Sequence, residues 1–79
     1  MSPTVFRYKS YRLFFFSREE VRLHIHIMSP GGEAKFWLKP IVALAWNKGL
    51  SSRQLKELQE VIEERANEIK LAWKRHFQS

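Results

Sequence analysis

The chain has 79 residues, of which 44% are hydrophobic and 14% aromatic, with no cysteine and a formal net charge of +6. This length suits one domain over residues 1–79, and the aromatic content argues against a disordered chain. Because cysteine is absent, the chain offers no disulfide, thiolate nucleophile or thiolate zinc ligand. Since neither a signal peptide nor an apolar run of membrane-spanning length is recognisable, we expect a cytoplasmic protein without membrane contact.

The positive charge is concentrated near the amino terminus. Residues 1–18 hold four basic side chains and no acid, whereas the rest of the chain is almost balanced. A basic edge on a small domain suits nucleic acid or an acidic protein partner, although plain solubility explains it equally well.

The first half of the chain shows the period-two alternation that is typical of strands. We expect a hairpin of strands over 4–9 and 11–17, a third strand near 23–28 and a fourth over 33–38. The turn between the last two is marked by Ser29-Pro30-Gly31-Gly32. Residues 41–46 are ambiguous, and we assign them to a fifth strand, so that the sheet spans roughly 4–46. Phe14 and Phe16 break the alternation, which suggests a strand covered on both faces.

The last third of the chain predicts one long helix over roughly 52–77. Ser51 and Gln54 have the spacing of a capping box at its start. Apolar residues then recur at intervals of three and four, at Leu55, Leu58, Ile62, Ala66, Ile69, Trp73 and Phe77. The predicted fold is therefore α+β, an antiparallel sheet of four to five strands with one long C-terminal amphipathic helix packed on one face.

His24 and His26 are the most suggestive pair of polar residues. They stand two residues apart on the predicted third strand, so their side chains leave the same face. Such a pair suits two ligands of one metal, an acid and a base acting on RNA, or ordinary polar residues on a half-exposed face. Glu33 and His76 are the nearest candidates for a third ligand, and neither is obvious. We keep His24 and His26 as candidate catalytic residues and assign no metal or cofactor.

A second candidate site combines basic and aromatic side chains. Arg7, Lys9 and Arg12 of the first hairpin, with Lys35 and Trp37 of the fourth strand, suit phosphate binding and base stacking or a protein contact. Aromatic residues in the first strands serve equally well as core. The sequence contains neither a phosphate-binding glycine loop before a helix nor a serine elbow, so it does not decide whether the protein is an enzyme.

Several stretches, taken together, resemble the bacterial family known as domain of unknown function 4160. They are the Pro3-Thr4-Val5 start, the His-x-His strand at His24 and His26, the run "EAKFWL" from Glu33 to Leu38, the Gly49-Leu50-Ser51 helix start and Trp73. The chain departs from the family where many members carry a further histidine and a run of prolines before the histidine pair. Residues 20–23 read "EVRL" there, which counts against a three-histidine metal site.

The resemblance implies a gene that stands beside one for a second small protein, commonly of domain of unknown function 2442 or of helix-turn-helix type. Such arrangements are similar to toxin–antitoxin modules. We therefore expect the toxin-like component of a type II toxin–antitoxin pair, neutralised by a cognate protein and with RNA as a candidate target. The alternatives are a non-enzymatic interaction or regulatory module, which includes the neutralising member, and a small histidine-based metal-binding domain. Homo-oligomerisation stays open.

Overall fold

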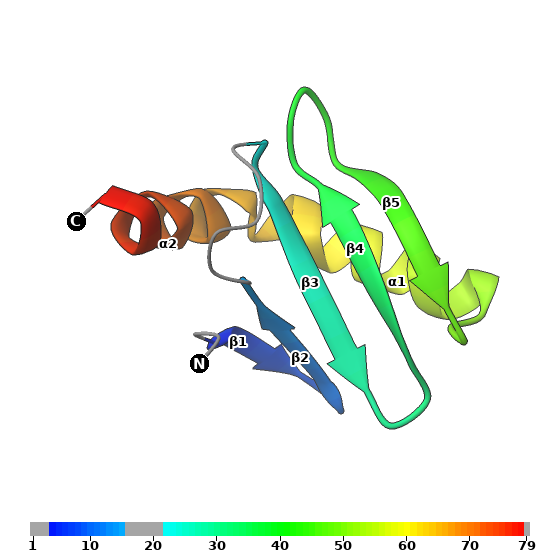
Figure 1. Cartoon of the computed structure of the whole chain (residues 1–79). Coiled ribbons are helices and arrows are strands. Elements are labelled where there is room, and N and C mark those ends of the chain that lie inside the picture. The colour runs from blue at the N-terminus through cyan, green and yellow to red at the C-terminus, as the bar shows by residue number, and fades with distance from the viewer. Residues whose placement is uncertain (1–3, 16–21, 79) are drawn as a thin grey trace.

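The computed structural model describes residues 4–15 and 22–78. Within these residues, five strands form one antiparallel sheet in chain order, namely β1 (Thr4–Tyr8), β2 (Tyr11–Phe14), β3 (His24–Ser29), β4 (Gly32–Trp37) and β5 (Ala43–Lys48) (Figure 1). The predicted α+β class is confirmed, and the ambiguous segment does form the fifth strand, which continues two residues beyond the predicted end of the sheet. The predicted end of the second strand, residues 16–17, lies outside the described residues.

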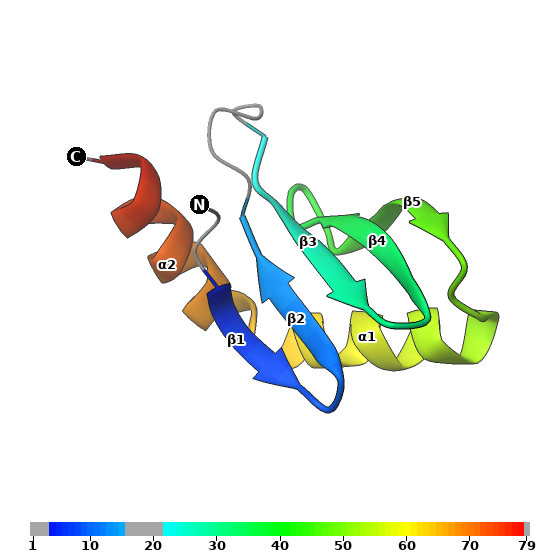
Figure 2. The same ribbon diagram turned by 60° about the horizontal axis from the view of Figure 1, so that its bottom comes forward.

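The prediction of one long helix is wrong. Two helices follow the sheet, α1 (Ser52–Glu64) and α2 (Ala66–Gln78), and Figure 2 shows α2 leaving the axis of α1 at an angle. Arg65 separates them, with a φ of −108° and a ψ of 21° that depart from helical values. The bend lets α2 reach the core, because it brings the fully buried Ile69 against the sheet and sets Trp73 edge to face on Phe15, with ring centroids 5.2 Å apart.

The start of α1 is fixed as the sequence predicts. The Ser51 hydroxyl accepts from the backbone N–H of Gln54 at 3.1 Å, and the Gln54 side chain accepts from the backbone N–H of Ser51 at 2.9 Å. Just before it, the Asn47 amide exchanges two hydrogen bonds of 3.1 Å with the backbone of Leu50. These bonds set the direction in which the chain leaves β5 and enters α1.

Both helices lie on one face of the sheet, which we call the inner face (Figure 1). The core fills the space between the helices and the inner face of the sheet. Its fully buried members include Leu13, Phe15, Ile25, Ile27 and Phe36 from the sheet side and Leu58, Ile62 and Ile69 from the helices. Neither described helix is long and apolar enough to cross a membrane.

Two glycines let the β3–β4 turn pack against the end of β5. A Cβ on Gly32 would collide with the carbonyl oxygen of Lys48, and a Cβ on Gly49 would lie 2.8 Å from the carbonyl oxygen of Gly31. Gly49 also has a φ of +91°, a conformation that side chains rarely adopt. The two backbones therefore touch at a point where only glycine fits.

Candidate nucleic-acid interface

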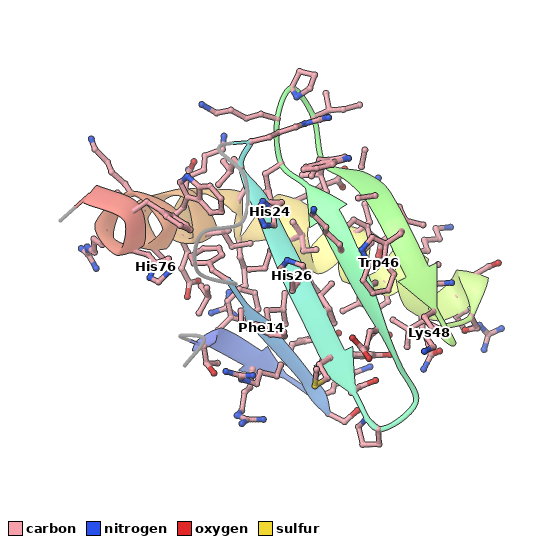
Figure 3. All side chains as sticks on the ribbon, viewed as in Figure 1. Phe14, His24, His26, Trp46, Lys48 and His76 are labelled. Atoms are coloured by element: carbon pink, nitrogen blue, oxygen red, sulfur yellow. The ribbon has the colours of Figure 1, made fainter. Side chains whose placement is uncertain are left out.

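The face of the sheet turned away from α1, which we call the outer face, carries a row of side chains across four strands. The strand register places Phe14 opposite His26, His26 opposite Lys35, and Lys35 opposite Trp46. Figure 3 shows Phe14, His26 and Trp46 on the side toward the viewer, in front of the helices. Because side chains alternate between faces, the residues two positions away on each strand share this face.

Phe14 and His26 form the middle of the row. The Phe14 ring is 3% exposed and stacks on the His26 ring, with centroids 5.6 Å apart and planes 26° apart. The Arg12 guanidinium lies over the Phe14 ring at 4.5 Å, and its Nε donates to the Thr4 hydroxyl at 2.6 Å. The β2 strand is therefore covered on both faces, as the broken alternation indicates.

His24 lies beyond the last β2–β3 pair, where its ring meets Trp73 of α2. Its ring has centroids 5.1 Å from His26, 5.0 Å from Trp73 and 5.9 Å from Trp37. Its Nδ1 stands 2.7 Å from the backbone oxygen of Arg22, and since a carbonyl only accepts, Nδ1 is the donor of this hydrogen bond.

Burial excludes one of the roles considered for the histidines. His24 is 0% exposed and His26 is 6% exposed, so the description of the pair as ordinary polar residues on a half-exposed face is wrong. Both rings are packed among aromatic rings. Any reactant would have to pass these rings to meet an imidazole nitrogen.

Trp37 is half-buried on the same face and is held between two cations. The Arg22 guanidinium lies 4.1 Å and the Lys35 ammonium 4.5 Å from the centre of its ring. Lys35 itself is only 8% exposed. The buried Lys35 side chain therefore packs against the Trp37 ring and supports it. Arg22 is a site residue that the sequence analysis missed, although it stands two positions before His24 and so shares its face.

Arg7 and Arg12 are brought together, as the sequence analysis expects. They are direct partners across β1 and β2, and they line a hollow of about 460 Å³ with Ser10, Met28, Ser29 and Pro30. Like charges directly opposite each other on neighbouring strands are unfavourable in isolation. An anion placed in this hollow would relieve that repulsion, so the pair is suited to a phosphate or a carboxylate.

Lys9 does not join this group. Its φ of +54° turns the chain between β1 and β2, and its ammonium stands 2.5 Å from a carboxylate oxygen of Glu57 on α1. The Tyr8 hydroxyl donates to the same oxygen at 2.6 Å. The ammonium and hydroxyl lower the pKa of Glu57, and the carboxylate in turn raises the pKa of Lys9 and of Tyr8. The charge of Lys9 is thus compensated on the helix side of the sheet.

Trp46, Lys48 and Met28 complete the outer face, and the sequence analysis missed all three as site residues. Trp46 is 44% exposed and Met28 is 41% exposed. Lys48 lies opposite Glu33 in the register of β4 and β5. Among the described residues, Glu33 is the one acid that the register places on this face. The period-two spacing of Trp46 and Lys48 could have indicated that they share this face. The predicted fifth strand ended at residue 46, so Lys48 was not included in it.

The histidine pair gains no third ligand in the described part of the chain, where no three His, Asp or Glu side chains gather closely enough to hold a metal ion. The register places Glu33 opposite Met28, two residues along the strands from the pair of His26 and Lys35. His76 packs instead against Phe15, with ring centroids 5.8 Å apart.

Fold and site together define a small α+β protein with helices on one sheet face and cations interleaved with aromatic rings on the other. A family model described as "Domain of unknown function (DUF4160)" matches residues 10–74, and the chain belongs to this family. The resemblance drawn from the sequence is thereby confirmed. No match was found among curated proteins or among solved structures.

Proposed function

We propose that this protein is the toxin-like member of a two-protein module and that it acts by binding single-stranded RNA on the outer face of its sheet. The observation that carries the proposal is the pairing of Arg7 with Arg12 on the same open face as the exposed Trp46. Cations hold phosphates and aromatic rings stack bases, which are the two interactions that single-stranded RNA needs.

The dimensions of the face suit a short stretch of RNA. Strands lie about 4.8 Å apart, so the width from β2 to β5 is roughly 14 Å. Sheets of similar width stack two or three bases in known RNA-binding modules. In the proposed complex Arg7, Arg12 and Lys48 contact phosphates and the exposed Trp46 stacks on a base. The Trp37 ring, covered by Arg22 and Lys35, borders this surface and packs against the edge of the RNA.

The buried histidines favour binding over cleavage as the activity of this face. General acid–base catalysis requires an imidazole nitrogen within hydrogen-bonding reach of the reacting group, either directly or through one water. His24 and His26 are enclosed by Phe14, Trp37 and Trp73, so RNA on the surface does not meet them in this conformation. Their catalytic role, predicted from the sequence, stays a prediction.

A cognate protein would neutralise the RNA-binding face by covering it. An acidic segment of that partner would replace the RNA phosphates at Arg7 and Arg12, and the exposed Trp46 and Met28 would anchor apolar side chains. The same exposed apolar pair favours the second candidate function, a non-enzymatic interaction module that uses this face for protein contact alone.

The affinity for a fluorescent single-stranded RNA oligonucleotide tests the proposal. We expect the double variant Arg7→Gln/Arg12→Gln to bind more weakly, and its plot of log affinity against log salt to be less steep by about 1.4, because two phosphate contacts are lost. The control Arg53→Gln/Lys56→Gln removes the same charge from exposed positions on α1 and should leave affinity and slope nearly unchanged. Equal losses in both variants would mean that only net charge matters.

Growth of bacteria after induced expression tests the cellular role. We expect arrest with this chain alone, rescue by the neighbouring gene, and loss of arrest in Arg7→Gln/Arg12→Gln. Unimpaired growth together with undetectable RNA affinity would reject the toxin-like role in favour of the interaction module.

A further inference from the structure

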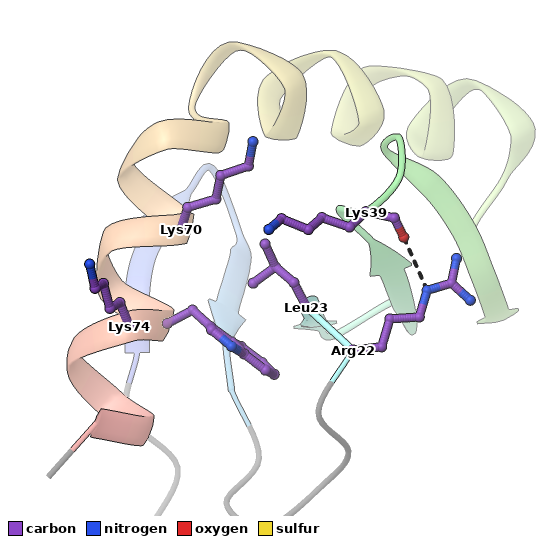
Figure 4. A pocket seen from close by; sticks show the side chains of 6 residues that line it. Arg22, Leu23, Lys39, Lys70 and Lys74 are labelled. Atoms are coloured by element: carbon purple, nitrogen blue, oxygen red, sulfur yellow. Dashed lines mark hydrogen bonds between the residues drawn. The ribbon is translucent and has the colours of Figure 1, made fainter.

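A second basic hollow lies near the bend between the helices, away from Arg7 and Arg12. It has a volume of about 470 Å³ and is lined by Arg22, Leu23, Lys39, Lys70, Trp73 and Lys74 (Figure 4). Four of these six side chains are cationic and none is acidic. A hollow with this lining attracts anions, and the buried Leu23 and half-buried Trp73 give it an apolar wall.

The bend at Arg65 creates this hollow. Lys70, Trp73 and Lys74 are three and four residues apart, so they share one side of α2, and the bend turns that side toward the start of β3. Lys39 comes from the connection between β4 and β5. Three segments far apart in the sequence therefore contribute cations to one space.

The lysines and the arginine have different tasks. Figure 4 shows the ammonium groups of Lys39 and Lys70 at the space between α2 and the β4–β5 connection, whereas the ammonium of Lys74 and the guanidinium of Arg22 are directed away from it. The Arg22 Nε donates to the backbone oxygen of Lys39 at 3.0 Å, and its guanidinium covers the Trp37 ring. Arg22 is thus a positioning residue that holds Lys39, and the ammonium groups of Lys39 and Lys70 are the ones that reach a ligand.

We propose that this hollow is a binding site for a phosphate group, held by Lys39 and Lys70, with Lys74 adding positive charge at its edge. Lysines four apart on a helix repel each other, and a third ammonium directed toward them adds to that repulsion. A bound phosphate reduces this repulsion and accepts charge-assisted hydrogen bonds from the ammonium groups of Lys39 and Lys70. The site stands apart from the proposed RNA face and does not depend on it.

The hollow adjoins the histidine cluster through one side chain. Trp73 lines the hollow and also meets the His24 ring at 5.0 Å. Phosphate binding in the hollow should therefore be detectable at Trp73 and His24, because a shift of the Trp73 indole changes the ring environment of His24.

The probe is inorganic phosphate, titrated at constant ionic strength into the ¹⁵N-labelled chain and followed by NMR. We expect saturable shifts at the amides of Lys39, Lys70 and Lys74 and at the Trp73 indole. In Lys39→Gln/Lys70→Gln the affinity should fall at least about tenfold, because two charge-assisted contacts are lost. The control Arg53→Gln/Lys56→Gln should keep the wild-type affinity, and circular dichroism should show that both variants fold.

Two short RNA oligonucleotides, one with a 5′-phosphate and one with a 5′-hydroxyl, identify the source of the phosphate. Shifts in the hollow with the 5′-phosphate oligonucleotide alone assign the site to a terminal phosphate or a small phosphate ester, and shifts with both assign it to the RNA backbone. Absence of saturable shifts with phosphate and with both oligonucleotides would overturn the proposal, as would equal weakening in the control variant. Loss of RNA binding at Arg7 and Arg12 alone would leave this site standing.

Discussion

The buried imidazole rings of His24 and His26 meet edge to face on the outer face of the sheet, with their centroids 5.1 Å apart. His26 stacks on Phe14 of β2, and His24 packs on Trp73 of α2. The histidine pair thus joins the proposed RNA-binding face to the second helix through a continuous chain of ring contacts.

Replacement of each histidine separates packing from chemistry. We expect His24→Ala to lower the free energy of unfolding by about 2–4 kcal/mol, because it leaves a cavity among three aromatic rings. We expect His26→Phe to fold, since a phenyl ring keeps the stacking on Phe14, and to retain RNA affinity and growth arrest. Urea denaturation and the growth assay measure these effects. If His26→Phe binds RNA normally but no longer arrests growth, the histidines carry chemistry.

Gly32 should tolerate no side chain. Gly32→Ala places a methyl group against the backbone of Lys48 and Gly49, and we expect a loss of about 1–3 kcal/mol in the free energy of unfolding. The neighbouring Gly31 has open space at its Cβ position, so Gly31→Ala should change stability by less than about 0.5 kcal/mol. Similar midpoints of urea denaturation for both variants would contradict the close approach of the turn to β5.

Stability should depend on pH through Glu57 and its two partners. The lowered pKa of Glu57 stabilises the fold above the ordinary value of 4.5, and this contribution is lost as the pH falls through the lowered pKa. The raised pKa values of Tyr8 and Lys9 stabilise the fold below their ordinary values of 10.0 and 10.5, and this contribution is lost as the pH rises through the raised values.

The variant Glu57→Gln measures the contribution of this group of three. Its melting temperature, relative to wild type, should be lowest at neutral pH and should approach the wild-type value toward both pH limits. The control Glu60→Gln changes an exposed acid on the same helix and should show no such profile. A difference between Glu57→Gln and wild type that is constant across the pH range would refute the linkage.

The cap of α1 gives a further stability test. Ser51→Ala removes the hydroxyl that accepts from Gln54 and should lower the free energy of unfolding by about 1 kcal/mol. Ser52→Ala, one residue into the helix, is the matched control and should be nearly neutral. Equal effects of the two substitutions would show that the capping box contributes little.

Local patterns predict much of this fold because the interactions that form it are local. Alternation in the first half of the chain identifies the strands, and the spacing of Ser51 and Gln54 identifies the start of α1. The bend at Arg65 has no such signal, since neither proline nor glycine marks it. Contacts with distant residues hold it instead, as in the Arg65 guanidinium 3.6 Å from the centre of the Phe6 ring.

The candidate site was predictable in part for the same reason. Period-two alternation correctly sets His24 and His26 on one face, but their burial depends on Trp73, which arrives from the far end of the chain. Alternation also groups Lys9 with Arg7, whereas a positive φ at Lys9 turns it toward Glu57. Three-dimensional packing, which no short window contains, decides both cases.

The most direct test of RNA binding on the outer face is NMR mapping of a single-stranded RNA oligonucleotide on the ¹⁵N-labelled protein. We expect saturable shifts at Arg7, Arg12 and Lys48 and at the indole N–H of Trp46, with unchanged amides at Arg53 and Lys56 on α1. Shifts confined to the helices, or no saturable shift at all, would contradict RNA binding on this face.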